Sequence, residues 1–344
     1  MTRAGERCAV LSQAVDEPLA GTAPHAPRWL CVEHRGAWPR EVGTHAEPAV
    51  RALAARATAA GWRPLLIRRP QRGAAGPLRV FLTDTVRCRT TTRTVDGPDA
   101  LADLPLPVGG DLPGTPVPDP LLLVCTHGRR DRCCALDGRA LVTALLAAGE
   151  PDVWECTHLG GHRFAPTALV LPTGYVYGRL DLPAAVAVRK SAGLGEVEPA
   201  RSRGRSAWTP AGQVAELAVR IATGLREAGG LAVVPGDDGA ADEEILVVAD
   251  DGRRWAVTVR SGGQPADARP AGARPGDSGR EPPPPGRAAA RPSAPGTHLR
   301  PASCGAEPEP VRPLRATAVR ALPSATGTAA GRPGGHLTSA GPPC

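Results

Sequence analysis

The segment from Cys125 to His162 concentrates the residue types that bind metals or carry redox chemistry. It holds four of the nine cysteines and three of the eight histidines in the 344-residue chain. Cys125 and Cys134 lie on either side of a loop rich in Gly, Arg and Asp, and His158 and His162 are four residues apart across Leu-Gly-Gly. Sulfur and imidazole side chains crowded in this way are typical of a metal or redox site.

Neighbouring residues compete with these four for the role of ligand. The sequence Cys-Thr-His occurs at 125–127 and again at 156–158, which makes His127 and Cys156 rival ligands. Cys156 also alternates with a tryptophan in a short apolar run, a pattern equally typical of a buried cysteine that packs as a small hydrophobic residue.

Cys133 competes directly with Cys134. Adjacent cysteines do not easily bind the same metal atom, so we expect only one of them to be the ligand, and we favour Cys134. The remaining cysteines are scattered along the chain and are assigned no role; they are Cys8, Cys31, Cys88, Cys304 and Cys344.

Composition divides the chain into a folded part and a tail. After Trp255 the sequence contains no Phe, Trp or Tyr, and the segment from Gly262 to Cys344 is dominated by Pro, Gly, Ala and Arg. Such a segment cannot bury enough apolar surface to offset the entropy lost on ordering, so we expect it to be disordered. It carries ten Arg against five Asp or Glu, a net charge of +5 out of +7 for the whole chain.

This charge distribution argues against nucleic-acid binding. A basic folded face would favour it, but most of the positive charge lies in the tail, and aromatic residues for base stacking are few. The first residues lack an apolar core of signal-peptide length, and no run approaches the roughly 18 apolar residues of a membrane span. We therefore expect a cytoplasmic protein without a membrane anchor, in a compartment where thiols stay reduced.

Apolar runs and turn residues predict an alternation of strands and helices. Strands are expected at 29–33, 64–67, 78–82, 121–124, 153–156, 166–171, 175–180, 244–249 and 254–259. Helices are expected at 45–60, at 135–148, from about 183, and at 209–227, where Thr209 is the expected cap and Pro210 the first helical residue. The Pro- and Gly-rich stretch 84–119 is expected to be a linker.

The order within 121–200 is strand, helix, strand, strand, strand, helix. This order favours a small α/β sandwich with a mixed sheet, of thioredoxin-like type. In such folds ligands gather in loops at the carboxyl ends of strands. Cys125 ends one expected strand and His158 follows another, so the cysteine and histidine pairs are expected to meet although more than twenty residues separate them.

Three segments together resemble the sucrase/ferredoxin-like family: GTAPHAPRWLCVEH, CTHGRRDRCC and HLGGHRFAP. The resemblance runs over about residues 21–180 and implies an iron–sulfur domain akin to the thioredoxin-like 2Fe-2S ferredoxins. In that class two cysteines on one loop and two more, four apart, on a later loop bind the cluster. The resemblance thus implies a 2Fe-2S cluster with Cys125 and Cys134 on one iron, and with His158 and His162 in the later positions on the other.

This implied ligand set predicts a one-electron carrier. Two neutral imidazoles in place of two thiolates remove two negative charges from the site, which raises the reduction potential. An imidazole ligand can also exchange a proton as the iron changes oxidation state, which couples electron transfer to pH. We expect redox partner proteins, with a flavin reductase as donor. The residues expected around the cluster, which stabilise negative charge on its sulfurs, are Gly128, Arg129, Arg130, Gly160 and Gly161.

Other functions compete with the electron carrier. A structural zinc module is the leading alternative because Cys2His2 is also a zinc ligand set, although zinc fingers prefer cysteines two to four residues apart. A thiol oxidoreductase using Cys133 or Cys134 would lack the Cys-x-x-Cys motif. A hydrolase with Cys125 as nucleophile and His127 as base lacks an identifiable orienting acid. No carboxylate pair supports a sucrase activity.

We divide the chain into four parts. The amino-terminal α/β domain at 21–115 repeats the order strand, helix, strand, strand, and we interpret it as a degenerate copy of the thioredoxin-like fold without cluster ligands. The ferredoxin domain follows at 121–200, then a helix with a β-hairpin at 205–260, and finally the tail at 262–344.

Overall fold

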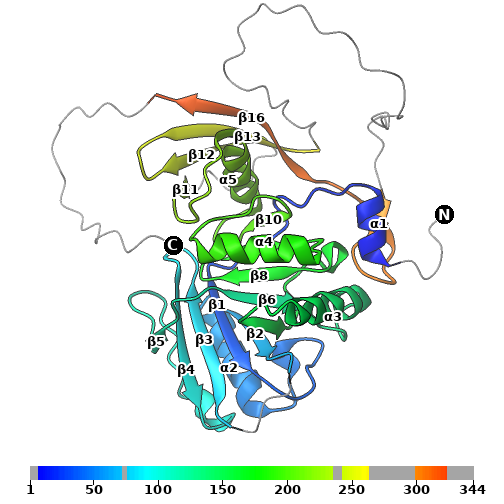
Figure 1. Cartoon of the computed structure of the whole chain (residues 1–344), viewed down its shortest axis with the longest axis vertical. Coiled ribbons are helices and arrows are strands. Elements are labelled where there is room, and N and C mark those ends of the chain that lie inside the picture. The colour runs from blue at the N-terminus through cyan, green and yellow to red at the C-terminus, as the bar shows by residue number, and fades with distance from the viewer. Residues whose placement is uncertain (1–6, 72–75, 235–241, 263–298, 324–344) are drawn as a thin grey trace, which may run out of the picture.

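The structure, a computed structural model, describes residues 7–71, 76–234, 242–262 and 299–323 (Figure 1). The elements up to the candidate site are α1 (Cys8–Ala14), β1 (Arg28–Glu33), α2 (Pro48–Ala59), β2 (Arg63–Arg68), β3 (Leu78–Asp84), β4 (Arg89–Val95), β5 (Thr115–Pro116), β6 (Leu121–Cys125), α3 (Arg132–Ala147) and β7 (Val153–Cys156). Those that follow are β8 (Ala168–Leu171), β9 (Tyr175–Tyr177), α4 (Leu182–Gly193), β10 (Ser202–Arg205), α5 (Pro210–Thr223), β11 (Leu231–Val234), β12 (Asp242–Ala249), β13 (Arg254–Ser261), β14 (Leu299–Pro301), β15 (Pro308–Pro310) and β16 (Leu314–Leu322). The predicted α/β class with a mixed sheet is confirmed.

One ten-stranded sheet runs through both halves of the chain, in the order β10-β9-β8-β6-β7-β2-β1-β3-β4-β5. In the first half β1 pairs in parallel with β2 and antiparallel with β3, and in the second half β6 pairs in parallel with β7 and antiparallel with β8. Helix α2 connects the parallel strands of the first half and α3 those of the second. The two halves therefore share one order of strand pairing, and they join edge to edge where β2 pairs with β7.

The strands alternate their side chains between two cores. In β1, Trp29 and Cys31 face one core, while Leu30 and Val32 pack against α2 on the other side. The β6 strand behaves in the same way and turns its even-numbered residues toward α3 and α4. The faces away from these helices form a continuous core shared by both halves.

The sheet curls around this shared core. Phe81 of β3 and Trp154 of β7 are separated by two strands in the sheet, yet their ring centroids lie 5.5 Å apart. Neighbouring strands alone are spaced by about 4.8 Å, so a flat sheet would hold these rings roughly 14 Å apart. The curl brings the carboxyl end of β6 into the buried interior.

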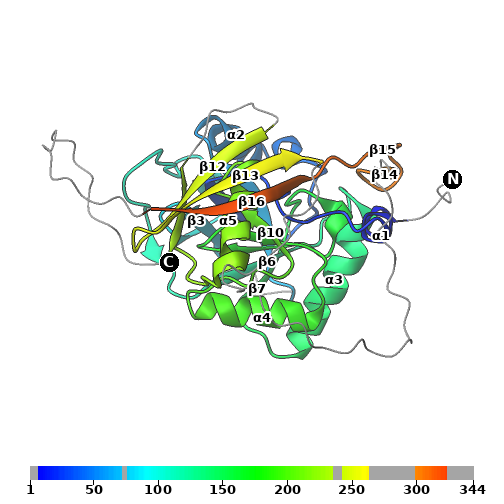
Figure 2. The same cartoon turned by 90° about the horizontal axis from the view of Figure 1, so that it is seen from above.

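A second sheet, in the order β11-β12-β13-β16, packs on α5 (Figure 2). The predicted hairpin of β12 and β13 is confirmed, and the side chain of Thr209 caps α5 by accepting a hydrogen bond from the Gly212 amide. Figures 1 and 2 show α5 between this sheet and the end of the larger sheet at β10.

The expectation of a disordered tail over 262–344 is wrong for residues 299–323. Strand β16 adds to the edge of β13, and β14 pairs with β15. A strand at a sheet edge gains backbone hydrogen bonds that no side-chain composition reveals, and Leu314, Ala316 and Val319 also pack on the α5 core. The rest of the expected tail, 263–298 and 324–344, lies outside the described residues.

Two further elements differ from expectation. The expected linker at 84–119 contains β4, whose threonines and arginines pair along the whole of β3. Threonine is β-branched and suits a strand even without an apolar pattern. The helix α1 near the amino terminus was not predicted from the sequence at all.

Candidate metal centres

Cys125, Cys134 and His158 lie together at the carboxyl ends of β6 and β7 in the large sheet. Each offers one ligand atom, and these atoms all lie within 4.8 Å of one another. Cys125 is the last residue of β6, His158 follows β7, and β6 and β7 are parallel with Cys125 in register with Cys156. Both chain segments thus leave the sheet at the same ends of these parallel strands. This brings the segment that carries Cys134 to the loop that carries His158 and His162.

Cys134 reaches Cys125 because α3 packs very closely on β6. The helix begins at Arg132, earlier than expected, so both adjacent cysteines stand in its first turn. The side chain of Asp131 caps the helix by accepting a hydrogen bond from the Cys133 amide. One turn further on, Gly138 faces the backbone of Cys125, and an added Cβ there would lie 2.1 Å from the Cys125 carbonyl oxygen.

The thiols of Cys125 and Cys134 behave as a coupled pair. The hydrogen bond from Cys134 holds the pKa of Cys125 well below its ordinary value, against the opposing effect of burial, and His158 lowers it further. The same hydrogen bond and burial raise the pKa of the Cys134 thiol. The direction of these two shifts favours the thiolate, the form that binds metals, at Cys125 rather than at Cys134.

His162 lies next to this group. Its Nδ1 is 3.4 Å from Nε2 of His158, and its Nε2 is 3.8 Å from Oδ2 of Asp131. Burial lowers the pKa of His162 more than the Asp131 carboxylate raises it, so the ring is neutral and able to bind a metal at neutral pH. Two buried ring nitrogens, Nδ1 of His158 and Nε2 of His162, have no hydrogen-bond partner.

Arg203 holds the loop at 158–162, here called the histidine loop, by a hydrogen bond to its backbone. Arg203 was not assigned this role from the sequence. It is 1% exposed, donates from Nη1 to the Gly160 carbonyl at 2.9 Å, and also donates to Thr22. Burial lowers the pKa of Arg203 to about 9. Gly161 adopts φ +67°, and a Cβ there would meet Arg203 Nη2 at 2.3 Å, so this close approach requires glycine.

The rival ligands make other contacts, although His127 lines the same pocket as His158 and its Nδ1 also has no hydrogen-bond partner. His127 turns its Nε2 to the Pro39 carbonyl at 2.7 Å and packs edge-on against Trp38. Cys156 is fully buried in the shared core, where burial raises the pKa of its thiol well above the ordinary value. Cys133 points away from Cys125, toward a second group of cysteines.

This second group comprises Cys8, Asp131, Cys133 and Cys304, which also place their ligand atoms within 4.8 Å of one another. Their residues come from α1, the start of α3 and the segment after β14, where Figure 1 shows α1 beside the carboxyl-terminal strands. Cys8 and Cys304 were assigned no role from the sequence. The two residues are far apart in the sequence, and only the tertiary structure brings them together.

A basic pocket of about 260 Å³ opens beside His158. Three arginines, Arg40, Arg63 and Arg130, line it together with His127 and His158. Two arginines that were expected around the cluster from the sequence lie at or next to the rim of this pocket. Arg130 forms an ion pair with Glu41. Arg129 is exposed, and its carbonyl accepts a hydrogen bond from Arg40. A Cβ added at Gly128 would lie 3.1 Å from the side chain of Ala135 in α3. A Cβ added at Gly160 would lie 4.0 Å from Nη2 of Arg63.

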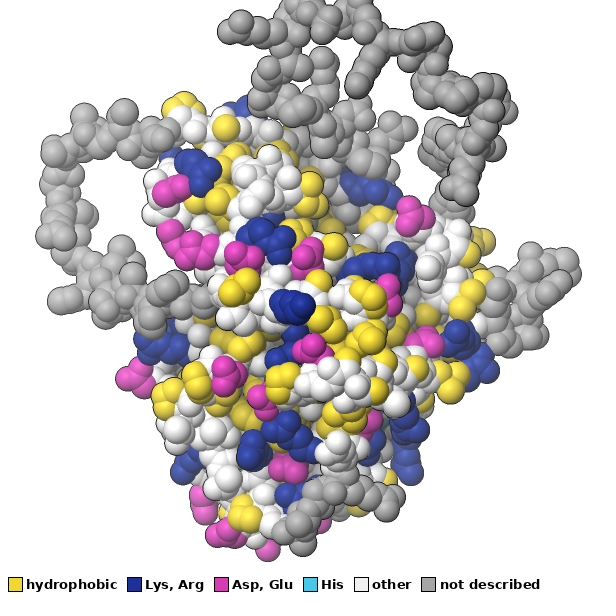
Figure 3. All heavy atoms as spheres, viewed as in Figure 1, with side chains coloured by type: hydrophobic (Ala, Val, Ile, Leu, Met, Phe, Trp, Pro, Cys, Tyr) yellow, Lys and Arg dark blue, Asp and Glu magenta, His cyan; other side chains and the backbone are white. Residues whose placement is uncertain are grey.

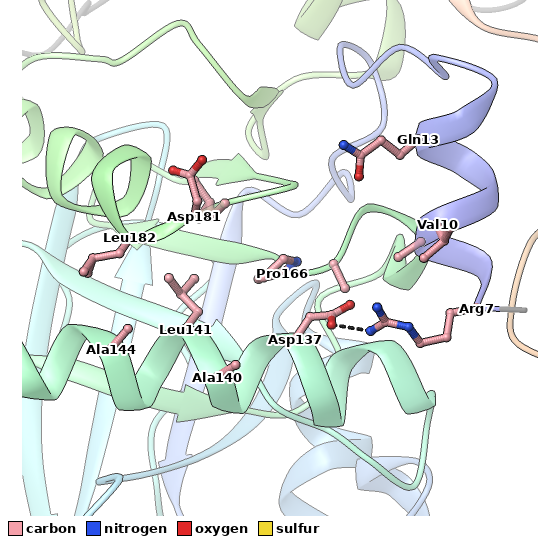
Figure 4. A pocket seen from close by; sticks show the side chains of 13 residues that line it. Arg7, Val10, Gln13, Asp137, Ala140, Leu141, Ala144, Pro166, Asp181 and Leu182 are labelled. Carbon is pink, nitrogen blue, oxygen red and sulfur yellow. Dashed lines mark hydrogen bonds and ion pairs between the residues drawn. The ribbon is translucent and has the colours of Figure 1, made fainter.

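A larger pocket, about 410 Å³, lies between α1, α3 and the start of α4 (Figure 4). Its lining is mostly aliphatic. Its charged groups are Arg7 and Asp137, which are paired with each other, and Asp181, which caps α4. The candidate metal ligands of both groups are absent from its described lining, so this pocket is separate from the candidate centres.

Two further features are the charge on one face of the molecule and the apolar length of the helices. On the face in Figure 3, basic and acidic side chains are interspersed rather than gathered into one patch. None of the helices in the described part of the chain has an apolar stretch long enough to span a bilayer.

Comparison with known proteins identifies the family. No curated protein and no solved structure matches the chain. The family model described as sucrase/ferredoxin-like matches residues 19–204, more than half of the sequence, and this range contains Cys125, Cys134, His158 and His162. The chain belongs to the sucrase/ferredoxin-like family.

Proposed function

We propose that this protein is a one-electron carrier whose 2Fe-2S cluster is held by Cys125, Cys134, His158 and His162. The observation that supports this most directly is geometric: the thiols of Cys125 and Cys134 lie within 4.8 Å of His158, next to His162, and two buried nitrogens of these imidazoles have no hydrogen-bond partner. Buried polar atoms are normally hydrogen-bonded, so orphaned nitrogens beside thiols suit a site that binds a metal.

The residues present fit such a cluster in charge as well as in donor type. A bound cluster would supply one-electron redox chemistry, with two imidazoles giving a higher potential than four thiolates. Burial favours the neutral form of His162, while the negative charge of Asp131, whose Oδ2 lies 3.8 Å from Nε2, favours the protonated form. This contact offers a route for coupling proton uptake to reduction.

The surroundings suggest where a redox partner docks. The pocket that opens beside His158 is rimmed by Arg40, Arg63 and Arg130. A partner with an acidic face, such as a flavin reductase, would be steered toward this rim and brought close to a histidine ligand. We propose that electrons enter or leave on this side.

A zinc module is the second candidate. The compactness of the group Cys125, Cys134 and His158, with ligand atoms within 4.8 Å, favours a single ion. The two candidates differ in metal content, in labile sulfide and in colour, so one preparation separates them.

The test is anaerobic purification of the full chain, followed by assays of iron and acid-labile sulfide and by visible absorption. About two iron atoms and matching sulfide per chain, with a charge-transfer band that shifts in His158→Cys, would support the carrier. The matched control is His127→Ala, which removes a nearby histidine outside the ligand set and should leave the band unchanged. Colourless protein with zinc, even after reconstitution with iron and sulfide, would favour the zinc module.

A further inference from the structure

Three thiols from distant parts of the chain meet at the outer end of α3. The Sγ atoms of Cys8 and Cys133 are 3.6 Å apart, those of Cys133 and Cys304 are 3.5 Å apart, and those of Cys304 and Cys8 are 3.7 Å apart. Cys8 and Cys133 are fully buried and Cys304 is partly exposed. The sulfurs form a nearly equilateral triangle.

The dimensions of this triangle match one face of a zinc tetrahedron. Zinc–sulfur bonds of about 2.3 Å at tetrahedral angles place two sulfurs about 3.8 Å apart. The Asp131 carboxylate stands beside the triangle, with Oδ1 3.4 Å from the Cys304 sulfur and 3.8 Å from the Cys8 sulfur. A zinc–oxygen bond of about 2.0 Å predicts roughly 3.5 Å for these sulfur–oxygen distances.

We propose that Cys8, Cys133, Cys304 and Asp131 bind one Zn²⁺ ion, at a second site that adjoins the candidate cluster site where Asp131 lies beside His162. The ion fastens α1 and the carboxyl-terminal segment to the first turn of α3. Ligands of a four-iron cluster would stand farther apart than these sulfurs do, and a disulfide would use only two of the three thiols.

The protein holds the ligands together independently of any metal. Glu17 and Arg300, both buried, form a two-pronged ion pair with distances of 2.6 and 2.7 Å. This pair ties the end of the α1 segment to β14 and thereby sets Cys304 near Cys8. The Cys304 amide in turn donates to Oδ2 of Asp131 at 2.9 Å.

The electrostatics of the site suit a divalent cation. Three sulfur donors and one carboxylate oxygen, all within 4.8 Å of one another, are a donor set that zinc accepts. Zinc would bind the three cysteines as thiolates and displace their protons. Three thiolates and a carboxylate exceed the charge of one zinc ion by two, and Arg7 interacts electrostatically with Cys133 and Cys304 to offset part of this excess.

The experiment measures zinc in the anaerobically purified full chain by mass spectrometry, in wild type and in two single variants. Cys304→Ser removes a ligand of the proposed zinc site, and Cys125→Ser removes a ligand of the candidate cluster site. About one zinc per chain that persists in Cys125→Ser and is lost in Cys304→Ser is the expected result. Zinc lost in Cys125→Ser and kept in Cys304→Ser would overturn the proposal.

Zinc-edge X-ray absorption on the wild-type chain provides a measurement that does not depend on how a variant folds. Three sulfurs at about 2.3 Å and one oxygen at about 2.0 Å are expected. A first shell of two sulfurs and two nitrogens would assign the zinc to Cys125, Cys134 and the histidines instead. Absence of zinc, or a peptide cross-linked by a disulfide between two of Cys8, Cys133 and Cys304, would equally overturn the site.

Discussion

Gly138 of α3 faces the carbonyl oxygen of Cys125 so closely that an added Cβ would lie 2.1 Å from it. This contact sets the distance between the helix that carries Cys134 and the strand that carries Cys125. We predict that Gly138→Ala forces α3 away from β6, lowers the free energy of unfolding by about 1–3 kcal/mol, and reduces the iron bound per chain. Chemical denaturation and metal analysis on the same preparation measure both effects.

Gly193 provides the matched control. It ends α4, has no atom within 4 Å of an added Cβ, and does not need a positive φ. Gly193→Ala should leave bound iron unchanged and keep or raise stability by up to about 1 kcal/mol. Equal effects of the two substitutions would show that helix propensity, and not the approach of α3 to Cys125, decides the outcome.

Arg203 should be irreplaceable by lysine. Its guanidinium donates to the Gly160 carbonyl and to both the hydroxyl and carbonyl oxygens of Thr22, whereas a lysine ammonium cannot reach all three in this geometry. Each buried acceptor left unpaired costs about 1–3 kcal/mol. We predict that Arg203→Lys loosens the histidine loop, lowers the melting temperature and releases iron.

The comparison variant for this test is Arg226→Lys. Arg226 pairs with Glu196 and Glu198, but its side chain is 40% exposed, so the substitution should change stability by less than about 1 kcal/mol. Thermal unfolding of both variants checks the contrast. Retention of full iron content by Arg203→Lys would argue that the histidine loop holds its shape without the guanidinium.

The Glu17–Arg300 ion pair should make the attachment of the carboxyl-terminal segment depend on pH. Burial alone would raise the pKa of Glu17, but hydrogen bonds from Arg300 and the charge of Arg163 lower it below its ordinary value of 4.5. A carboxyl with a depressed folded pKa contributes stability above its unfolded pKa and loses it as the pH falls through the folded one. Glu17→Gln should therefore cost about 3 kcal/mol near pH 7, and the difference from wild type should shrink below about pH 4.5.

Glu309 is a control that shares the same arginine. It pairs with Arg300 at 2.8 Å, but its side chain is 55% exposed, so Glu309→Gln should cost at most about 1 kcal/mol. Urea denaturation from pH 3.5 to 7 measures both variants. A Glu17→Gln difference that stays constant over this range would contradict the assignment of the pH dependence to Glu17.

The strand β16 should be needed for stability although its sequence lacks aromatic residues. It pairs along most of β13 and contributes to the core on α5. We predict that a chain ending at Pro313, which keeps β14 and β15 and lacks β16, exposes the edge of β13, unfolds at a lower temperature and aggregates more readily. Light scattering and thermal unfolding against the full chain check this. An unchanged melting temperature would show that β16 is dispensable.

Much of the candidate cluster site could be predicted from local sequence. The apolar run ending in Cys125 and the strand before His158 predicted that both lie at carboxyl ends of strands, and β6 and β7 are indeed parallel neighbours. Strand β4 and helix α1 escaped prediction because neither carries a strong apolar period. Arg203 also escaped, since an arginine in a short Ser-Arg-Gly-Arg sequence resembles a solvated turn until the fold buries it.

The sequence by itself determined the types and the spacing of the candidate ligands and the repeated strand–helix–strand–strand order, because these depend on residue chemistry and local periodicity. Only the tertiary structure decided that Cys133 turns away from Cys125 toward Cys8 and Cys304. That grouping depends on a helix register, a buried ion pair between Glu17 and Arg300, and an edge strand, all contacts between residues far apart in the chain. Such contacts leave no periodic trace in the sequence, so they emerge only once the chain is folded.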